Sequence, residues 1–434
     1  MRYTRTLLQI LIIGCLATGF LSSCGGDDPD TPETKAKRTV LIYMCAENSL
    51  NSFYESDSTE IVRGAANLPD DVNLMVYADR SSSKTVKPFI AKVEKDGMHI
   101  VKQYKEDWYS TDKEKMSDII SWTFSKYPAD SYAMTFWGHG NGWIMVPDAN
   151  TTNPSTKVNA RRKAYGWDSG KDNPDGGDGY EKFINIPTLA EVLSKTEHID
   201  YIFFDCCQMM CAELAYELRN VCDYIVGSPA EIPGYGAPYD HVVPDFFLAK
   251  DNVGKAIVDD YINYSDLSAY GGLPLSVVKT SNMDNLLHAT QSAIDTIMVH
   301  YQYPNNLPVY DVIYYGKNQY SHSRSVFYDL RNVMRKYLSE SDFAKWDETF
   351  QQTVVYSVHP ADIIDTSRPD WMSNELLSYN FKEFKMNDNN YGGLSMFIPQ
   401  TYYSNVESKY LNPNVSIKTF QWNKGIDWTK FGWE

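Results

Sequence analysis

The chain has 434 residues, of which 43% are hydrophobic and 22% charged. This is the composition of a globular protein and excludes wholesale disorder. The formal net charge is −16, whereas binding to nucleic-acid phosphates requires a basic surface, so we expect no nucleic-acid partner. Seven cysteines are too few for a disulfide scaffold in a chain of this length.

The first residues have the pattern of an export signal. Arg2 and Arg5 precede an apolar run, Leu7–Phe20, which is too short for a comfortable membrane-spanning helix and typical of a signal peptide. The next residues, Leu21–Cys24 (LSSC), resemble a bacterial lipobox. The alternative is an ordinary signal peptide with an incidental cysteine.

The lipobox resemblance implies that residues 1–23 are removed and that Cys24 receives a lipid, which would anchor the protein in the outer membrane of a bacterium. Residues 24–37 begin with a polar, turn-rich stretch and are predicted to form a flexible tether. The acidic run at residues 27–30 resembles a surface-export signal and favours display on the cell surface.

The body of the chain alternates apolar runs with amphipathic segments. Thr39–Cys45 and Val72–Ala78 are typical of strands buried on both faces, and a helix is predicted between them from about Leu50 to Ala66. One or two outer strands are predicted within Val86–Val101. A helix is predicted over Lys113–Lys126, which Tyr127-Pro128 ends. Three further strands are predicted: Ser131–Trp137, Ile199–Phe204 and Tyr224–Val226.

This order of strands and helices predicts an α/β/α sandwich with a mostly parallel central sheet. We place the core at residues 38–247 and a C-terminal subdomain, packed on the core, at residues 248–434. That subdomain is predicted to add four helices and one strand: Val253–Tyr264, Met283–Tyr301, Arg324–Leu338, Asp342–Gln352 and the strand Gly393–Pro399. Its aromatic tail is predicted to pack on the body, with carbohydrate binding as the alternative: Phe420, Trp422, Trp428, Phe431 and Trp433.

Parallel sheets place their functional residues just beyond the carboxyl ends of strands, and one such place is the segment after Trp137. There His139 lies between Gly138 and Gly140, and glycines allow another part of the chain to approach closely. We interpret His139 as a functional residue. The alternative is a structural histidine.

The second such place is Asp205-Cys206-Cys207, after the strand Ile199–Phe204. Side chains two apart on an extended segment face the same way, so Asp205 and Cys207 are predicted to line one side and Cys206 the other. A helix is predicted to start near Gln208, where its N-terminus would favour a thiolate. The alternative is that Asp205 caps that helix.

Other uses of these thiols are a zinc site, a disulfide and core packing. The spacing of Cys206, Cys207 and Cys211 matches no zinc motif, and adjacent cysteines rarely bridge each other. Cys211 and Cys222 are predicted to pack in the core. A catalytic pair of cysteine and histidine is the favoured interpretation.

Together, four segments resemble the clostripain family of cysteine peptidases, relatives of the caspases, gingipains and legumains. The segments are Thr39–Leu50 (TVLIYMCAENSL), Trp137–Trp143 (WGHGNGW), Phe204–Met209 (FDCCQM) and Ser228–Tyr239 (SPAEIPGYGAPY). Three positions depart from the family pattern: Glu47 stands for aspartate, Cys206 for alanine and Ala237 for tryptophan.

The resemblance implies a caspase-like fold and a cysteine endopeptidase that needs no cofactor. Cys207 would be the nucleophile, passing through a thioester, and His139 the general acid and base. The main-chain amides of Gly140 and Cys207 would hold the oxyanion. Asp205 would lie in the substrate pocket and select protein or peptide substrates with arginine or lysine before the cleaved bond. The alternative is an inactive surface lipoprotein that binds a partner through the same scaffold.

Between the two motifs, residues 144–186 are predicted to form a long functional loop. The resemblance implies activation by self-cleavage there, between Lys163 and Ala164 or after Arg162. Some relatives need calcium, so calcium binding by the acidic residues of this loop is an expectation, although their spacing is not that of an EF-hand. These residues are Asp168, Asp172, Asp175, Asp178 and Glu181.

Overall fold

The computed structural model describes residues 31–80, 87–145, 164–170, 182–267, 272–300, 312–315, 326–359, 386–403 and 412–431. Nine strands within these ranges form one sheet in the order β12-β10-β9-β8-β5-β1-β2-β3-β4. Five neighbouring strands at its centre are parallel. They are β9 (Cys222–Gly227), β8 (Ile199–Asp205), β5 (Ala129–Trp137), β1 (Ala36–Ala46) and β2 (Val72–Arg80).

Antiparallel strands complete both edges of the sheet. β3 (Phe89–Glu94) and β4 (Gly97–Gln103) form a hairpin beside β2, which confirms the predicted outer strands. At the opposite edge, β10 (Leu275–Lys279) pairs with β9 and β12 (Val354–Val358) pairs with β10. Both of these strands follow residue 247, so the sheet continues from the predicted core into the C-terminal part of the chain.

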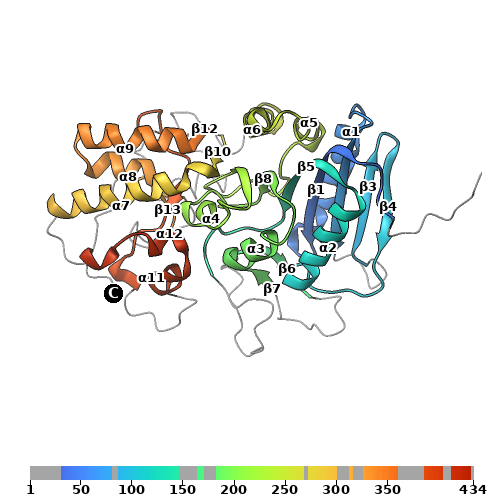
Figure 1. Ribbon diagram of the computed structural model, residues 1–434, viewed down its shortest axis with the longest axis horizontal. Coiled ribbons are helices and arrows are strands. Elements are labelled where there is room, and N and C mark those ends of the chain that lie inside the picture. The colour runs from blue at the N-terminus through green and yellow to red at the C-terminus, as the bar shows by residue number, and fades with distance from the viewer. Residues whose placement is uncertain are drawn as a thin grey trace, which may run out of the picture.

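Helices cover both faces of the sheet. Figure 1 shows α1 (Tyr54–Ala65), α5 (Tyr239–Asp245) and α6 (Lys250–Tyr264) on one face, and α2 (Lys113–Lys126) and α3 (Ile186–Leu193) on the other. This double cover explains why β1 is fully buried from residue 40 to 46, as a continuous apolar run predicts. The predicted α/β/α sandwich is confirmed.

Several local predictions need correction. The helix expected from Leu50 begins as a 3₁₀ turn, Ser49–Ser52, and α1 follows it. The helix expected near Gln208 is α4 (Ala212–Glu217), which starts later because Gln208 adopts a left-handed conformation with φ 59°. The region 144–186 contains a small sheet of β6 (Tyr165–Asp168) and β7 (Lys182–Ile184), and the sequence analysis missed α3.

The C-terminal part packs beyond the β10–β12 edge (Figure 1). Its helices are α7 (Met283–His300), α8 (Leu330–Tyr337), α9 (Glu340–Thr353), α11 (Pro413–Ser416) and α12 (Gln421–Lys424). β11 (Tyr328–Asp329) pairs with β13 (Ser395–Met396), so α8 is shorter than the predicted helix. Short 3₁₀ turns lie at Thr280–Asn282, Thr401–Tyr403, Ile417–Thr419 and Trp428–Phe431.

The aromatic tail is part of the core where it is described. Phe420, Trp422 and Trp428 are buried, and Trp422 makes an edge contact with Tyr216 of α4. This confirms the packing prediction for those three residues. The side chain of residue 431 and all of residue 433 lie outside the described residues. Within the described ranges, no helix has the length and apolarity needed to cross a bilayer.

Candidate active site

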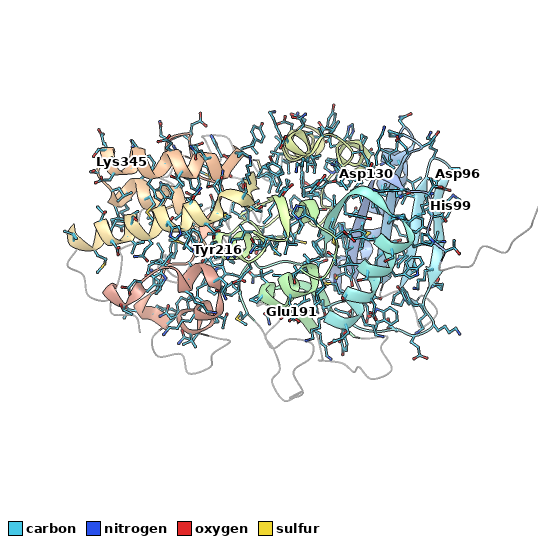
Figure 2. All side chains as sticks on the ribbon, viewed as in Figure 1. Asp96, His99, Asp130, Glu191, Tyr216 and Lys345 are labelled. Carbon is cyan, nitrogen blue, oxygen red and sulfur yellow. The ribbon has the colours of Figure 1, made fainter. Side chains whose placement is uncertain are left out.

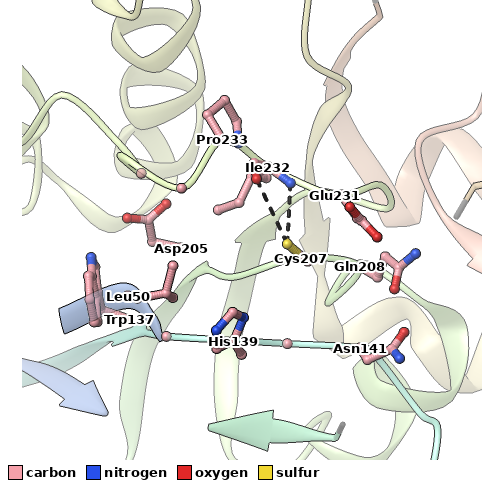
Figure 3. Close-up of a pocket in the computed structure, with 14 residues that line it drawn as sticks. Leu50, Trp137, His139, Asn141, Asp205, Cys207, Gln208, Glu231, Ile232 and Pro233 are labelled. Carbon is pink, nitrogen blue, oxygen red and sulfur yellow. Dashed lines mark hydrogen bonds between the residues drawn. The ribbon is translucent and has the colours of Figure 1, made fainter. Parts of the chain in front are cut away.

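The register of two parallel strands brings the two predicted motifs together. In the β5–β8 pair, Trp137 is the partner of Asp205. His139 and Cys207 each follow two residues later, so they leave the sheet side by side at the same edge. Both line one pocket of about 330 Å³, which also includes Asp205 and Gly140. Figure 3 shows His139 next to Cys207 in this pocket.

Gly140 is required by the close approach of the cysteine segment. A Cβ atom at this position would lie 2.6 Å from the carbonyl oxygen of Cys207 and 2.9 Å from Cβ of Cys206. Real Cβ atoms do not make such contacts, so any side chain here would push the two motifs apart. The glycine therefore serves the close approach that the sequence predicts.

The two adjacent cysteines have opposite environments. Cys206 is fully buried and its thiol donates a hydrogen bond to the carbonyl of Phe136 (3.1 Å). Burial, followed by the charge of Asp205, raises the pKa of the Cys206 thiol well above its usual value. Cys207 is only partly buried and lines the pocket. This is the alternation that the extended strand predicts, and it makes Cys207 the accessible thiol.

The main-chain donor beside Cys207 comes from a different element than the sequence suggested. The N–H of Ile232 donates a hydrogen bond to Sγ of Cys207 (3.4 Å; Figure 3). An amide at this position stabilises a thiolate. The predicted helix N-terminus does not supply this donor, because α4 begins five residues after Cys207. Nothing in the local sequence around Ile232 indicates this contact.

Two side chains that the sequence analysis missed hold His139. Nε2 of His139 is hydrogen-bonded to Oγ of Ser49, at 2.9 Å. The ring of Trp167 lies against the imidazole, with 5.1 Å between the ring centroids. Ser49 belongs to the first family-like segment and Trp167 to β6, so only the assembled sheet edge brings both to His139.

The carboxyl group of Asp205 is buried and lines one side of the pocket. Oδ2 accepts hydrogen bonds from the N–H of Ala237 (3.1 Å) and the hydroxyl of Tyr239 (2.9 Å), and Oδ1 accepts one from Tyr261 (3.3 Å). Burial raises the pKa of Asp205 to about 6, although these donors oppose the shift. The reading of Asp205 as a helix cap is wrong, because α4 starts at Ala212 after Cys211 as its cap residue.

A second buried acid lies behind the pocket. Asp57 of α1 accepts a hydrogen bond from Nε1 of Trp137 (2.7 Å), and Trp137 lines the pocket. Burial and the nearby charge of Asp205 raise the pKa of Asp57 to about 8. These shifts favour a protonated Asp57 and an ionised Asp205 at neutral pH.

The predicted cleavage site borders the histidine segment. Lys163 and Arg162 lie outside the described residues, and Ala164 is buried. The carbonyl of Ala164 accepts a hydrogen bond from the N–H of Asn141, and the N–H of Gly166 donates to the carbonyl of His139, both at 2.9 Å. Residues directly after Lys163 are thus paired with the strand end that carries His139.

The remaining predicted site residues are divided between described and undescribed parts of the chain. Asp168 is fully buried in β6. The other four acidic residues of the loop and the predicted lipidation site lie outside the described residues: Asp172, Asp175, Asp178, Glu181 and Cys24.

Comparison with known proteins identifies the family. The model of the clostripain family matches residues 42–433. Clostripain of Hathewaya histolytica is 23% identical over an alignment of 459 positions, which covers 91% of this chain and 81% of that protein. A solved structure of a secreted C11 cysteine protease from Bacteroides thetaiotaomicron, in complex with an irreversible peptide inhibitor, is 27% identical with a TM-score of 0.69. The alignment covers 91% of this chain and 99% of that one.

A second solved structure shares the fold. It is an inactive zymogen C11 protease from Parabacteroides distasonis, 24% identical with a TM-score of 0.64, over 91% of this chain and 99% of that one. The family match favours catalysis over the alternative of an inactive binding lipoprotein. The chain belongs to the clostripain family and is a cysteine peptidase.

Proposed function

We propose that this peptidase is an endopeptidase that cleaves after arginine or lysine, with Cys207 as nucleophile and His139 as general acid and base. The observation that carries the proposal is the composition of one pocket, which is lined by the Cys207 thiol, the His139 imidazole and the Asp205 carboxylate. The proposed nucleophile, the general acid and base, and the carboxylate that would bind a basic side chain can thus contact one bound peptide.

The proposed reaction has two steps. The Cys207 thiolate attacks the scissile carbonyl carbon, and the main-chain N–H groups of Gly140 and Cys207 hold the oxyanion. His139 protonates the departing amine, which leaves a thioester on Cys207. Water, deprotonated by His139, then attacks the thioester and releases the carboxylate product and the thiol. Ser49 and Trp167 support this role because they fix the position of the imidazole.

The substrate preference rests on Asp205. A partly enclosed carboxylate gains a charge-assisted hydrogen bond from a basic side chain. A neutral side chain would leave the carboxylate without a counter-charge, so the pocket selects against it. The tyrosine hydroxyls of residues 239 and 261 hold the carboxylate in place. Protonated Asp57 behind the pocket adds no competing charge at neutral pH.

Peptide reporters and three variants test this assignment. Reporters with Arg, Lys, Leu or Asp before the cleaved bond should be turned over only when that residue is basic. A lysyl or arginyl chloromethylketone should label Cys207. Cys207→Ala and His139→Ala should abolish activity, whereas Cys206→Ala, the matched control, should reduce it modestly at most. Full loss in Cys206→Ala with activity retained in Cys207→Ala would overturn the assignment.

We further propose that the enzyme activates itself by cutting between Lys163 and Ala164 or after Arg162. The pairing of residues 164–166 with the His139 strand end supports this, because a cut there frees a chain end beside the catalytic histidine. Mass spectrometry of purified wild type and Cys207→Ala provides the test. Two fragments are expected only for the wild type, and identical intact chains in both would refute self-cleavage.

We also propose that a lipid on Cys24 anchors the mature enzyme to the outer membrane. The lipobox-like Leu21–Cys24 supports this. Fractionation of expressing cells should find the wild type in the membrane and Cys24→Ala in the soluble fraction. Protease shaving of intact cells should then distinguish surface display from a periplasmic orientation. Equal solubility of the two proteins would contradict the anchor.

A further inference from the structure

A second carboxylate, that of Glu231, lines the pocket that holds the catalytic pair. Figure 3 shows the side chains of Glu231 and Asp205 on opposite sides of Cys207. The proposed reaction uses Asp205 to bind the substrate and assigns no role to Glu231. A peptide bound across Cys207 would nevertheless meet one carboxylate on each side.

The main chain fixes the position of Glu231 beside the nucleophile. The N–H of Gln208 donates a hydrogen bond to the carbonyl of Ala230 (2.8 Å), and the N–H of Ile232 donates to Sγ of Cys207 (3.4 Å). Glu231 stands between these two contacts. The side chains of Ala230 and Ile232 are buried, whereas Glu231 is partly exposed and faces the pocket. The loop therefore presents this carboxylate to a bound substrate.

The charge of the pocket suits a substrate with more than one basic side chain. Among the described residues, no lysine or arginine lines the pocket. The labelled side chains nearest to Glu231 in Figure 3 include the neutral amides of Asn141 and Gln208. A carboxylate in these surroundings gains a charge-assisted hydrogen bond from a cationic side chain and repels an acidic one.

The two carboxylates are placed to contact neighbouring residues of one peptide. Adjacent side chains of an extended peptide point to opposite sides. When the residue before the cleaved bond (P1) reaches Asp205, the residue before it (P2) and the residue after the bond (P1′) both point toward Glu231. The proposed proton transfer to the departing amine places P1′ beside His139. The loop of Glu231 and Ile232 lies across Cys207 from His139 (Figure 3), which favours P2 as the residue that the loop contacts.

We propose that Glu231 forms a subsite for a basic P2 side chain, so that the preferred substrates carry two consecutive basic residues before the cleaved bond. This inference rests on the proposed function, in which Asp205 binds P1. The proposed self-cleavage site of the chain has the same pattern, Arg161-Arg162-Lys163. A cut after Lys163 places Arg162 at P2, and a cut after Arg162 places Arg161 there. P1′ is basic in only one of these two cuts.

Coumarin reporters of the form acetyl-X-Lys test the subsite, because the dye replaces P1′ and X at P2 is the variable residue. Arginine, methionine and glutamate at X compare a positive, a neutral and a negative side chain. For wild type, kcat/KM should be about 5-fold higher with arginine than with methionine, the upper range for an ion pair open to solvent, and lowest with glutamate. Glu231→Gln should make arginine and methionine equal, and Glu231→Lys should reverse the order. Each ratio is measured within one variant, so a misfolded fraction does not change it.

The chain offers a matched control on the surface of α3. Glu191 is exposed there and pairs with Lys195 (2.8 Å), and Figure 2 shows it on that helix. Glu191→Gln makes the same chemical change as Glu231→Gln and should keep the wild-type ratios.

Three results would overturn the P2 subsite while the preference for a basic P1 residue remains. They are equal turnover of the arginine and methionine reporters by wild type, wild-type ratios in Glu231→Gln, and a preference for basic P1′ that depends on Glu231 in internally quenched peptides. By contrast, no turnover of any reporter with a basic P1 residue would refute the proposed function itself, and this inference with it.

Discussion

Replacing Asp205 by asparagine would keep the shape of the side chain and remove the negative charge from the pocket. A bound arginine or lysine would then lie in the pocket without its counter-ion. Removing one partner of a buried ion pair costs about 3–5 kcal/mol. Because the pocket opens to solvent at Cys207, we expect the lower end, which is about a 100-fold loss in kcat/KM for basic reporters. A leucine reporter should lose little.

The assay compares Arg, Lys and Leu reporters on wild type and Asp205→Asn. Asp245→Asn is the control, because burial also raises the pKa of Asp245, to about 7, and this residue does not line the pocket. It should leave the ratio of Arg to Leu turnover unchanged. An equal loss for Arg and Leu reporters in Asp205→Asn would refute the selective role of Asp205 and indicate a structural one.

The pH dependence of the same ratio gives a second check. The pKa of Asp205 is about 6, so the carboxylate is ionised at pH 7 and protonated at pH 5. The Arg to Leu ratio of kcat/KM should therefore fall as the pH decreases through 6, because kcat/KM reports the free enzyme. Titration of Cys207 and His139 affects both reporters alike and cancels in the ratio. Asp205→Asn should abolish this dependence.

Three further variants test the supports of the site. Ser49→Ala removes the hydrogen bond to His139 and should lower kcat by about 2–10-fold, with KM unchanged and with rescue by Ser49→Thr; an unchanged kcat would exclude the positioning role. Gly140→Ala should lower the free energy of unfolding by about 1–3 kcal/mol, measured with denaturant, together with a loss of activity; wild-type stability would contradict the close approach to Cys207. Asp57→Asn tests whether Asp57 is protonated in the folded protein. The pKa of Asp57 is about 8 in the fold, whereas the pKa of an aspartate in the unfolded chain is about 4. Relative to this variant, wild type should therefore lose up to about 1.4 kcal/mol of stability per pH unit between pH 4 and 8, and parallel pH profiles would show that Asp57 is ionised in the fold.

Local patterns determined the order of the core elements. Continuous apolar runs predicted the five parallel strands, and the Tyr127-Pro128 stop predicted the end of α2 correctly. The alternating direction of side chains along an extended strand predicted that Cys207 faces the pocket and that Cys206 faces the other way. These patterns can be recognised in the amino-acid sequence because they depend on neighbouring residues and on the periods of strands and helices. The same reasoning failed near Gln208, where a tight turn, and no helix, follows the strand.

The amino-acid sequence by itself determined which residue types stand at the strand ends, including His139, Asp205 and Cys207. Only the tertiary structure decided what surrounds them. Ser49 reaches His139 across 90 residues of chain, and Ile232 reaches Cys207 across 25. The buried carboxyl groups of Glu47, Asp79 and Asp168 meet at the ends of three separate strands. Such contacts follow from sheet register and from the packing of distant segments, and these leave no periodic pattern in the sequence.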